Sequence, residues 1–474
     1  MKVLGRHIEI AKFTQIVNSP KAEFVAIYGR RRVGKTFLIK EFFNNEFTFY
    51  ATGLHKGNTA MQLTSFTIFI NQSFLTNHEP FANWLQAFNQ LIKELKKKKG
   101  KKILFIDELP WLDTKKADFI TGLDFFWNSW ASTQANLKLF VCGSAASWII
   151  NNLIKNNGGL HNRLTARLKL EPFTLYETEL FLKSKSIALD RYQIIQLYMA
   201  FGGIPYYLDH VQKGLSAAQI IDDLCFKKLG ILKTEFTYIF TSLFTNAQKH
   251  EQIIRIIFAL GGSANREAII AKGKFNTGGD VSSKLKELEE SGFITAYTKY
   301  GLTSAKKLYA ISDFYTLFYL KFIEPSAKKP KDNWLSKIDD PATKAWAGFT
   351  FEQVCMQHTE QILEALKIGG ISSYITTWQK KATATAKGTQ IDLVIDRRDR
   401  IINLCEIKFT INPFTITKAY DLALRNKVAI FKETTKTTKA VFCTMITTYG
   451  LVKNEYSGSF IQNQITMDDL FKQH

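Results

Sequence analysis

The stretch Glu23–Phe43, EFVAIYGRRRVGKTFLIKEFF, decides the fold of the first part of the chain. Its opening apolar run ends at a glycine, and a helical pattern begins after Thr36. The letters between them, GRRRVGKT, match the pattern G-x-x-x-x-G-K-[ST] in the strand-to-helix context that this pattern requires. Its glycines let backbone N–H groups surround a phosphate, and the helix N-terminus attracts negative charge. The stretch therefore predicts a strand, a phosphate-binding loop and a helix.

This loop predicts ATP as a ligand, together with Mg²⁺. Lys35 is expected to reach the outer phosphates, and the hydroxyl group of Thr36 is expected to bind the metal ion. The residues of this segment that are expected to line the nucleotide are Gly29, Arg32, Val33, Gly34, Lys35, Thr36 and Phe37.

A pair of acidic residues, Asp107 and Glu108, follows the apolar run ILFI. We expect Asp107 to hold Mg²⁺ through water and Glu108 to polarise the water that attacks the terminal phosphate. The alternative is that both acids cap the next helix. A further apolar run, LKLFVCGS, ends at Ser144, which is placed either to sense the γ-phosphate or to cap a helix.

The order of apolar runs and helical patterns divides the chain into modules. Four strand-like runs separated by helical stretches predict an α/β fold with a parallel sheet, and a helical region follows from about Glu171. From His250 the order is helix, helix, helix and hairpin, which is that of a winged helix. The expected modules are a core at 1–170, a helical lid at 171–247, a winged helix at 248–323, a linker at 324–337 and a last domain at 338–474.

The predicted winged helix has two interpretations. Its third helix mixes lysines with glutamates, which favours a protein-contact module over a reader of the DNA major groove. The other interpretation is that the hairpin binds the DNA backbone through its lysines, which are Lys299, Lys306 and Lys307.

A second motif lies in GTQIDLVIDRRDRIINLCEIKFT, which runs from Gly388 to Thr410. Asp392 and Glu406 each lie seven positions from Asp399, so a hairpin centred there would place their carboxylates opposite each other. Lys408 falls on the same strand face as Glu406. Two close carboxylates repel unless a divalent cation lies between them, which predicts Mg²⁺ or Mn²⁺ at this position. The alternatives are a salt-bridged exposed hairpin and a module that only binds.

The amino-acid composition limits the binding partners and the cellular compartment that we expect. The 474 residues carry a formal net charge of +21, which favours polyanions such as nucleic acid, although a generally basic proteome or a solubility effect would give the same excess. The five cysteines form no C-x-x-C pair, so neither a disulfide framework nor a zinc site is indicated. No run approaches the roughly 18–20 apolar residues of a membrane span, and the first residues lack a signal-peptide pattern. We expect a cytoplasmic protein without a membrane partner.

Five segments together resemble the archaeal-type ATPases related to the STAND and AAA+ classes: LGRHIEI, IYGRRRVGKT, LFIDELPWL, VCGSAASWI and FGGIPYYL. The resemblance covers Leu4 to Pro325 and implies a helical lid and a winged helix. In our leading interpretation, ATP binding and hydrolysis switch the arrangement of the C-terminal modules, and a second copy of the chain, forming a homo-oligomer, is among the expected partners. The resemblance also implies that Pro205, in Gly203-Ile204-Pro205, packs near the adenine.

Two arginines, Arg163 and Arg167, have the spacing of one helical turn. Either would act as an arginine finger, in cis or from a neighbouring subunit. The alternative is that they are ordinary surface arginines. The family resemblance places an arginine-bearing loop at Leu153–Arg167, where the usual Gly-Arg pair reads Asn162-Arg163. We take Arg163 as the candidate finger.

The second motif resembles the PD-(D/E)XK nucleases and resolvases over about residues 340–474. That resemblance implies a restriction-endonuclease-like fold and a glutamate on the preceding helix, which Glu352 matches, so the candidate metal ligands are Glu352, Asp392 and Glu406. It implies metal-dependent cleavage of DNA, with Lys408 positioning the nucleophile or neutralising the phosphate. Two rivals are a STAND-like switch whose tail binds a partner or nucleic acid without cutting it, and a DNA remodeller that binds through its winged helix.

Overall fold

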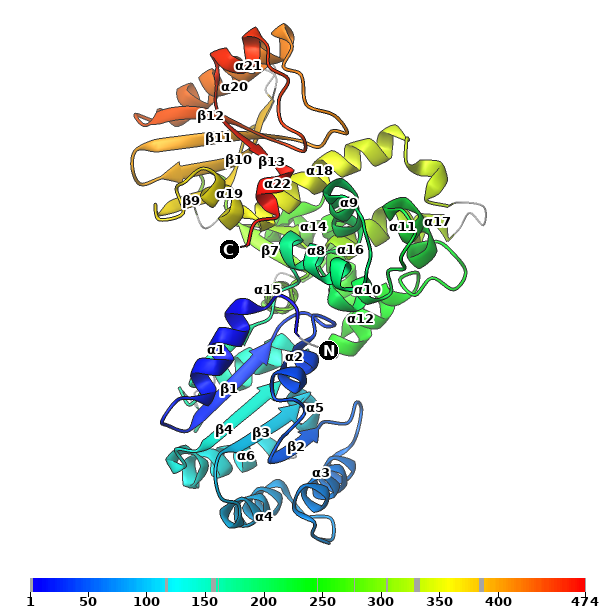
Figure 1. Ribbon diagram of the computed structural model, residues 1–474, viewed down its shortest axis with the longest axis vertical. Coiled ribbons are helices and arrows are strands. Elements are labelled where there is room, and N and C mark those ends of the chain that lie inside the picture. The colour runs from blue at the N-terminus through cyan, green and yellow to red at the C-terminus, as the bar shows by residue number, and fades with distance from the viewer. Residues whose placement is uncertain are drawn as a thin grey trace. The chain divides into compact units, whose positions relative to one another are not determined.

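The computed structural model describes residues 3–115, 118–154, 159–160, 162–244, 246–276, 278–303, 306–327, 333–382 and 388–473. The chain forms two compact units (Figure 1). The first unit comprises Met1–Pro172, Ser242–Thr245 and Lys286–Gly292, and the second comprises Phe173–Thr241, Asn246–Leu285 and Phe293–His474. In the described part of the chain, no helix has the length and apolar character needed to cross a bilayer.

The first unit contains a five-stranded parallel sheet, which confirms the predicted α/β class. Its strand order is β2-β3-β4-β1-β5. The strands are β1 (Glu23–Tyr28), β2 (Phe49–Thr52), β3 (Lys102–Asp107), β4 (Leu137–Cys142) and β5 (Ala166–Lys169). Four of them coincide with the four apolar runs of the sequence. The fifth, ARLK, was not predicted because an edge strand that alternates apolar and charged residues lacks an apolar run.

Strand β5 corrects the expected geometry of the two arginines. Arg167 lies within β5 and pairs with Ala26 of β1, whereas Arg163 lies in the preceding loop. The two residues are therefore not one helical turn apart, because backbone pairing to β1 holds this segment extended.

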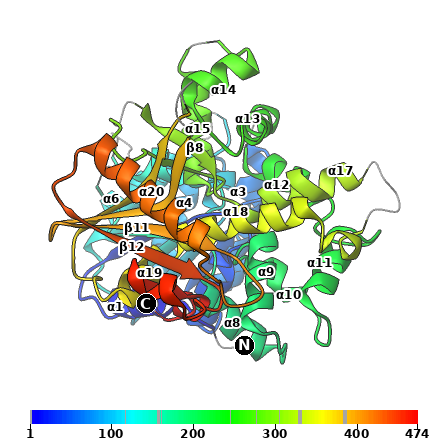
Figure 2. The same ribbon diagram turned by 90° about the horizontal axis from the view of Figure 1, so that it is seen from above.

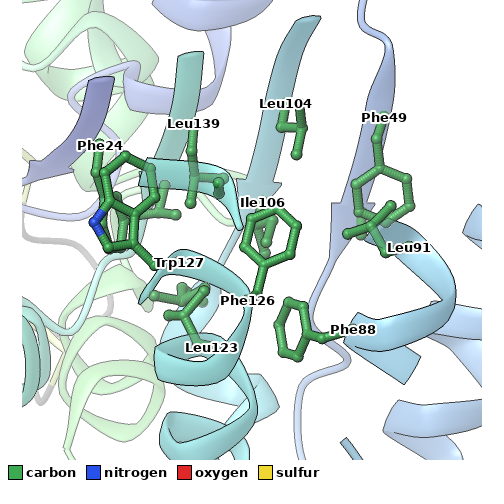
Figure 3. Close-up of a cluster of buried hydrophobic side chains, with 14 of the residues drawn as sticks. Phe24, Phe49, Phe88, Leu91, Leu104, Ile106, Leu123, Phe126, Trp127 and Leu139 are labelled. Carbon is green, nitrogen blue, oxygen red and sulfur yellow. The ribbon is translucent and has the colours of Figure 1, made fainter. Parts of the chain in front are cut away.

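Helices pack on the sheet through a core of large apolar side chains. Figure 3 shows strand residues such as Phe24, Ile106 and Leu139 pointing toward Phe126 and Trp127 of a facing helix. Burying each such side chain stabilises the fold by about 1.5–3 kcal/mol. The helices of the first unit are α1 (His7–Val17), α2 (Lys35–Phe42), α3 (Thr59–Phe74), α4 (Trp84–Lys97), α5 (Leu109–Leu112), α6 (Phe119–Ser129) and α7 (Ala146–Ile149), with a π-helical turn at Ile150–Ile154.

The range 171–247, the predicted lid, is helical: α8 (Leu175–Ser184), α9 (Arg191–Phe201), α10 (Pro205–Asp209), α11 (Ala217–Cys225) and α12 (Glu235–Leu243). These helices belong to the second unit, except that α12 from Ser242 onward is in the first. The region of the predicted winged helix contains α13 (Ala247–Ala259), α14 (Arg266–Gly273) and α15 (Asp280–Glu290), and an antiparallel sheet in the order β6-β8-β7. The hairpin strands are β7 (Ile294–Tyr297) and β8 (Leu308–Ile311), and the short strand β6 (Ser263–Asn265) adds to the predicted set.

The expected linker at 324–337 is only partly a connection. Residues 328–332 lie outside the described residues. On one side the chain is helical, in a π-helical segment (Tyr319–Ile323) that follows α16 (Phe314–Phe318) and leads into α17 (Glu324–Ser326). On the other side Trp334 is buried, and its backbone N–H donates to Asp222 at 2.7 Å. Its ring packs among the rings of Phe226, Phe318, Phe322 and Trp346. The residues around Trp334 therefore belong to a core, because a tryptophan side chain offers more apolar area than a solvated linker would expose.

The C-terminal part of the second unit is a mixed sheet in the order β13-β12-β11-β10-β9. Strands β9, β10 and β11 pair antiparallel, and β11, β12 and β13 pair parallel. They are β9 (Ser373–Lys380), β10 (Thr389–Arg397), β11 (Ile401–Lys408), β12 (Ala440–Thr447) and β13 (Ile461–Thr466). Helix α18 (Pro341–Gln357) packs against β10 and β11, and α20 (Lys418–Thr435) packs against β10 and β12 (Figure 2). Short helices α19 (Thr359–Ala365), α21 (Glu455–Ser459) and α22 (Met467–Leu470) complete it.

Candidate nucleotide-binding and carboxylate sites

The loop between β1 and α2 has the backbone of an anion cradle. Gly29, Arg32 and Gly34 all have positive φ angles, of 136°, 72° and 91°. A Cβ atom at Gly29 would lie 2.3 Å from the carbonyl oxygen of Leu170, so no other residue fits there without moving the backbone that follows β5. Alternation of such conformations turns successive N–H groups toward one concavity, which is the geometry that binds phosphate.

Lys35 closes this loop. Its side chain is buried, and its Nζ donates to the carbonyl oxygens of Gly29 at 3.0 Å and Arg30 at 2.9 Å. Burial lowers the pKa of Lys35, while the nearby Cys142, Glu108 and Asp107 side chains oppose the shift. An ammonium that donates to carbonyl oxygens of its own loop is well placed to exchange them for phosphate oxygens.

Asp107 and Thr36 meet at the carboxyl edge of the sheet, as expected for a metal-holding pair. The Thr36 hydroxyl donates to Asp107 Oδ2 at 3.0 Å and lies 3.1 Å from Oδ1. The buried thiol of Cys142 also donates to Asp107 Oδ1, at 2.6 Å. Cys142 was not among the predicted site residues. The sheet register explains its position, because Ile106 pairs with Val141 and the next residues along are Asp107 and Cys142.

Glu108 and Ser144 form the second pair at this edge. The Ser144 hydroxyl donates to Glu108 Oε1 at 2.8 Å, and its backbone N–H donates to Oε2 at 3.1 Å. Neither side chain caps a helix: Glu108 is the N-cap residue of α5 but makes no side-chain cap bond, and the N-cap residue of α7 is Ala145. Glu108 also has a left-handed backbone, with φ 44°. This geometry aims the Glu108 carboxylate at Ser144, at the edge of the sheet where the loop lies.

The other candidate nucleotide contacts differ in their surroundings. Val33, within the loop, is buried, and Phe37 on α2 is exposed. Arg163 is exposed, with its Nε 3.5 Å from the carbonyl oxygen of Gly159. Pro205 is the first residue of α10, in the second unit. The roles predicted for Arg163 and Pro205 stay predictions.

The motif of the C-terminal sheet has the register that the sequence predicts. Leu393 pairs with Cys405, and the pairs continue to Asp396 and Ile402, so the next residues outward are Asp392 and Glu406. The Asp392 carboxylate accepts the backbone N–H of Ile407 at 3.0 Å. Both acidic side chains are buried, with 8% of Asp392 and 3% of Glu406 exposed. The alternative of an exposed salt-bridged hairpin is therefore wrong.

Glu406 is surrounded by cationic and polar groups. Lys427 Nζ lies 2.6 Å from Glu406 Oε1, and Lys408 Nζ lies 3.9 Å from Oε2. The Tyr420 hydroxyl lies 3.5 Å from Oε2. Burial and then Asp392 raise the pKa of Glu406, against the effect of the two lysines. Lys427 and Tyr420 were not among the predicted site residues. They lie two helical turns apart on α20, a spacing that places them on one helix face. The sequence does not show which strand that face contacts.

Glu352, on α18, belongs to the same electrostatic cluster. Burial and the Asp392 and Glu406 carboxylates raise the pKa of Glu352 to about 8, while Lys408 and Lys427 oppose them. The three acidic side chains offer only oxygen ligands, which suits Mg²⁺ or Mn²⁺. Within the described ranges, no three acidic, histidine or cysteine side chains have the geometry of a ready metal site. The oxygen donors of these side chains fit a divalent cation. In this structure, the Lys427 ammonium neutralises the Glu406 carboxylate.

Contacts within the second unit connect this cluster to helix α9. Phe351 and Phe409, each next in sequence to a cluster residue, pack with ring centroids 5.1 Å apart. Phe409 in turn stacks on Tyr192 of α9 at 4.7 Å and 7°. Arg191 forms an ion pair of 2.8 Å with Asp468. The carboxylates therefore sit in a module that is packed against the predicted lid.

Comparison with known proteins supports the first site. The family model of an ATPase domain found predominantly in Archaea matches residues 4–211. This range contains the loop, the Asp107 and Glu108 pair and Ser144. The predicted resemblance to archaeal-type ATPases is confirmed for this part of the chain, whereas the resemblance of the C-terminal part to nucleases stays a prediction.

Similar proteins extend over more of the chain. Uncharacterized protein MJECL04 of Methanocaldococcus jannaschii is 24% identical over 410 residues, covering 86% of this chain and 87% of that protein. Among solved structures, the Walker-type ATPase PABY2304 of Pyrococcus abyssi is 18% identical with a TM-score of 0.49, covering 68% of this chain and 96% of that one. The ORC2 protein of Aeropyrum pernix, in its ADPNP–ADP complexes, is 13% identical with a TM-score of 0.42, covering 69% and 95%.

Proposed function

We propose that residues 1–170 bind Mg²⁺ and ATP and hydrolyse the nucleotide, and that this reaction controls a metal-dependent DNA nuclease-like domain at 338–474. The lid at 171–247 and the winged helix at 248–323 would transmit the nucleotide state. One observation carries the ATPase proposal: Lys35, Thr36, Asp107 and Glu108 meet at the carboxyl edge of one parallel sheet, beside a loop built to hold an anion.

Each residue at this edge has a defined task. Lys35 would leave the carbonyl oxygens of its own loop for the outer phosphates. Thr36 and Asp107 would hold Mg²⁺, which neutralises charge on the phosphates when it is bound. Glu108, oriented by Ser144, would hold the attacking water in line with the terminal phosphorus. Arg163 would supply further positive charge, from this chain or from a neighbouring copy.

Two substitutions separate nucleotide binding from hydrolysis. Lys35→Ala should abolish detectable ATP binding in calorimetry, because it removes the ammonium that donates to two carbonyl oxygens of the loop and that is expected to contact the outer phosphates. Glu108→Gln should bind ATP but hydrolyse it about 100- to 10,000-fold more slowly, the usual cost of losing a positioned base. Unchanged ATP affinity in Lys35→Ala would overturn the assignment of the loop.

The nuclease proposal rests on the buried acidic cluster and on charge. Burying three carboxylates close together costs folding free energy unless cations accompany them. A bound metal ion would offset this cost and would explain why all three are present. A bound divalent ion there would activate water and stabilise charge on a scissile phosphate. Lys408 lies beside Glu406 and would contact that phosphate. The net charge of +21 suits a DNA substrate.

This proposal is tested by incubating the purified chain with supercoiled, linear and branched DNA, with and without Mn²⁺ and ATP. Cleavage of at least one form should require Mn²⁺ and should be lost in Glu406→Ala. Absence of cleavage from every form would reject a nuclease.

A second candidate function is an ATP-controlled switch whose C-terminal domain binds a partner or nucleic acid without cutting it. The observation that favours it is the neutralisation of Glu406 by lysines, since a charge already paired does not need a metal. ATP-dependent assembly of the chain into oligomers, without cleavage and equally in Glu406→Ala, would select this function over the nuclease.

A further inference from the structure

Lys427 makes the shortest ionic contact of the acidic cluster, yet it comes from a different element than the motif. It extends from α20 to Glu406 Oε1 at 2.6 Å, whereas Lys408, on the same strand as Glu406, remains 3.9 Å from the other oxygen. Glu406 is 3% exposed, and the Lys427 side chain is 31% exposed. One end of this pair is fixed in a strand, and the other is a flexible chain with access to solvent.

As long as it is ionised, a fixed buried carboxylate needs a cation beside it, because an uncompensated charge in a poorly solvated place is strongly destabilising. Without a metal, Lys427 meets that requirement. With a divalent cation bound to Glu406, the Lys427 ammonium would face a like charge at short range. The two cations therefore compete for one carboxylate.

We propose that Lys427 is an exchangeable counter-cation: it occupies Glu406 in the metal-free protein, yields it to a divalent cation, and then binds a phosphate of the DNA. The proposal rests on the proposed nuclease function. It assigns a substrate-binding role to a residue of α20. It also predicts that metal binding increases the affinity for DNA and that DNA binding increases the affinity for the metal.

The geometry favours exchange over a permanent ion pair. A lysine side chain has four methylene groups and rotates freely where it is exposed, so Lys427 can move by several ångströms without moving α20. Glu406 keeps Lys408 and Tyr420 as neighbours when Lys427 leaves. A phosphate beside the metal would be the nearest new anion for the released ammonium.

Metal affinity gives the first test. Mn²⁺ binding to the full chain is measured by calorimetry at pH 8 without nucleotide, for the wild type, Lys427→Met, Lys427→Arg and Glu406→Gln. Lys427→Met should bind Mn²⁺ about tenfold more tightly, because the competing charge is gone while most of the unbranched side chain is kept. Lys427→Arg should stay near the wild type. Lys432→Met, on an exposed lysine of the same helix, is the matched control and should not change Mn²⁺ affinity.

DNA affinity gives the second test. Fluorescence anisotropy of a labelled duplex is compared in EDTA and in Ca²⁺, which fills the site while the DNA stays intact. Lys427→Met should weaken DNA binding about fivefold in Ca²⁺, because one phosphate contact is lost, and should leave it unchanged in EDTA. An equal loss in both conditions, or no loss in either, would overturn the exchange.

The outcomes distinguish this inference from the function on which it rests. Mn²⁺ binding that Glu406→Gln abolishes but Lys427→Met does not tighten would reject the role of Lys427 and leave the metal site standing. Absence of Mn²⁺ binding in the wild type and in Lys427→Met, with thermal unfolding midpoints unchanged, would reject the metal site itself and the inference with it.

Discussion

At the scale of single residues, Cys142 illustrates how a side chain without chemistry of its own shapes a site. Its thiol donates to the carboxylate that is proposed to hold Mg²⁺, and burial raises the pKa of Cys142 well above its usual value. The thiol therefore remains a neutral donor. It fixes Asp107 from one side while Thr36 fixes it from the other.

Replacing Cys142 tests this role. Cys142→Ala removes one hydrogen bond to Asp107, worth about 1 kcal/mol, and should weaken the apparent Mg²⁺ affinity of ATP hydrolysis about fivefold. Cys142→Ser keeps a donor and should stay close to the wild type. A titration of ATPase rate against Mg²⁺ measures both, and equal values for the alanine and serine variants would contradict a positioning role.

At the scale of helices, His358 joins two parts of the second unit. It separates α18 from α19, and the structure buries it fully between α18 and the start of α8. Its Nε2 accepts the backbone N–H of Leu175 at 3.0 Å, and its Nδ1 lies 2.8 Å from the carbonyl oxygen of Val354, to which it donates as the neutral tautomer. A neutral ring satisfies both contacts, whereas a protonated Nε2 would lose the first.

This contact predicts acid sensitivity. Burial lowers the pKa of His358 to about 4, against the usual 6.5, so the unfolded chain takes up a proton near pH 6.5 and the folded chain does not. Between pH 6.5 and pH 4 the wild type should lose about 3 kcal/mol of unfolding free energy through this residue. His358→Asn should lack this part of the pH dependence, and His55→Asn, an exposed control, should keep it. Urea unfolding at several pH values measures the difference; identical slopes for all three proteins would contradict the assignment.

Trp334 gives a second prediction at this scale. Because the indole packs among four aromatic rings, Trp334→Ala should cost about 3–5 kcal/mol of unfolding free energy. The adjacent Leu335 side chain is 47% exposed, so Leu335→Ala should cost little. Thermal unfolding of the two variants decides whether this segment belongs to the core or behaves as the free linker that its composition suggested.

At the scale of the whole chain, the sequence predicts what depends on local patterns. The phosphate loop and four parallel strands follow from apolar runs and glycines, and the register of β10 and β11 follows from the position of one turn. The residues that were missed act across elements. Lys427 and Cys142 meet their carboxylates through helix packing and strand pairing, and β5 is an edge strand whose pairing with β1 no local pattern reveals.

The two sites belong to separate units. We therefore expect a substitution in one site to abolish the activity of that site and to leave the activity of the other. DNA cleavage with Mn²⁺ and ATP hydrolysis are measured in parallel on the wild type, Lys35→Ala, Glu406→Ala and the control Lys432→Met. We expect Glu406→Ala to lose cleavage and keep ATP hydrolysis, Lys35→Ala to lose hydrolysis and any effect of ATP on cleavage, and the control to keep both. Cleavage that persists in Glu406→Ala, or is absent from the wild type under every condition, would contradict the account.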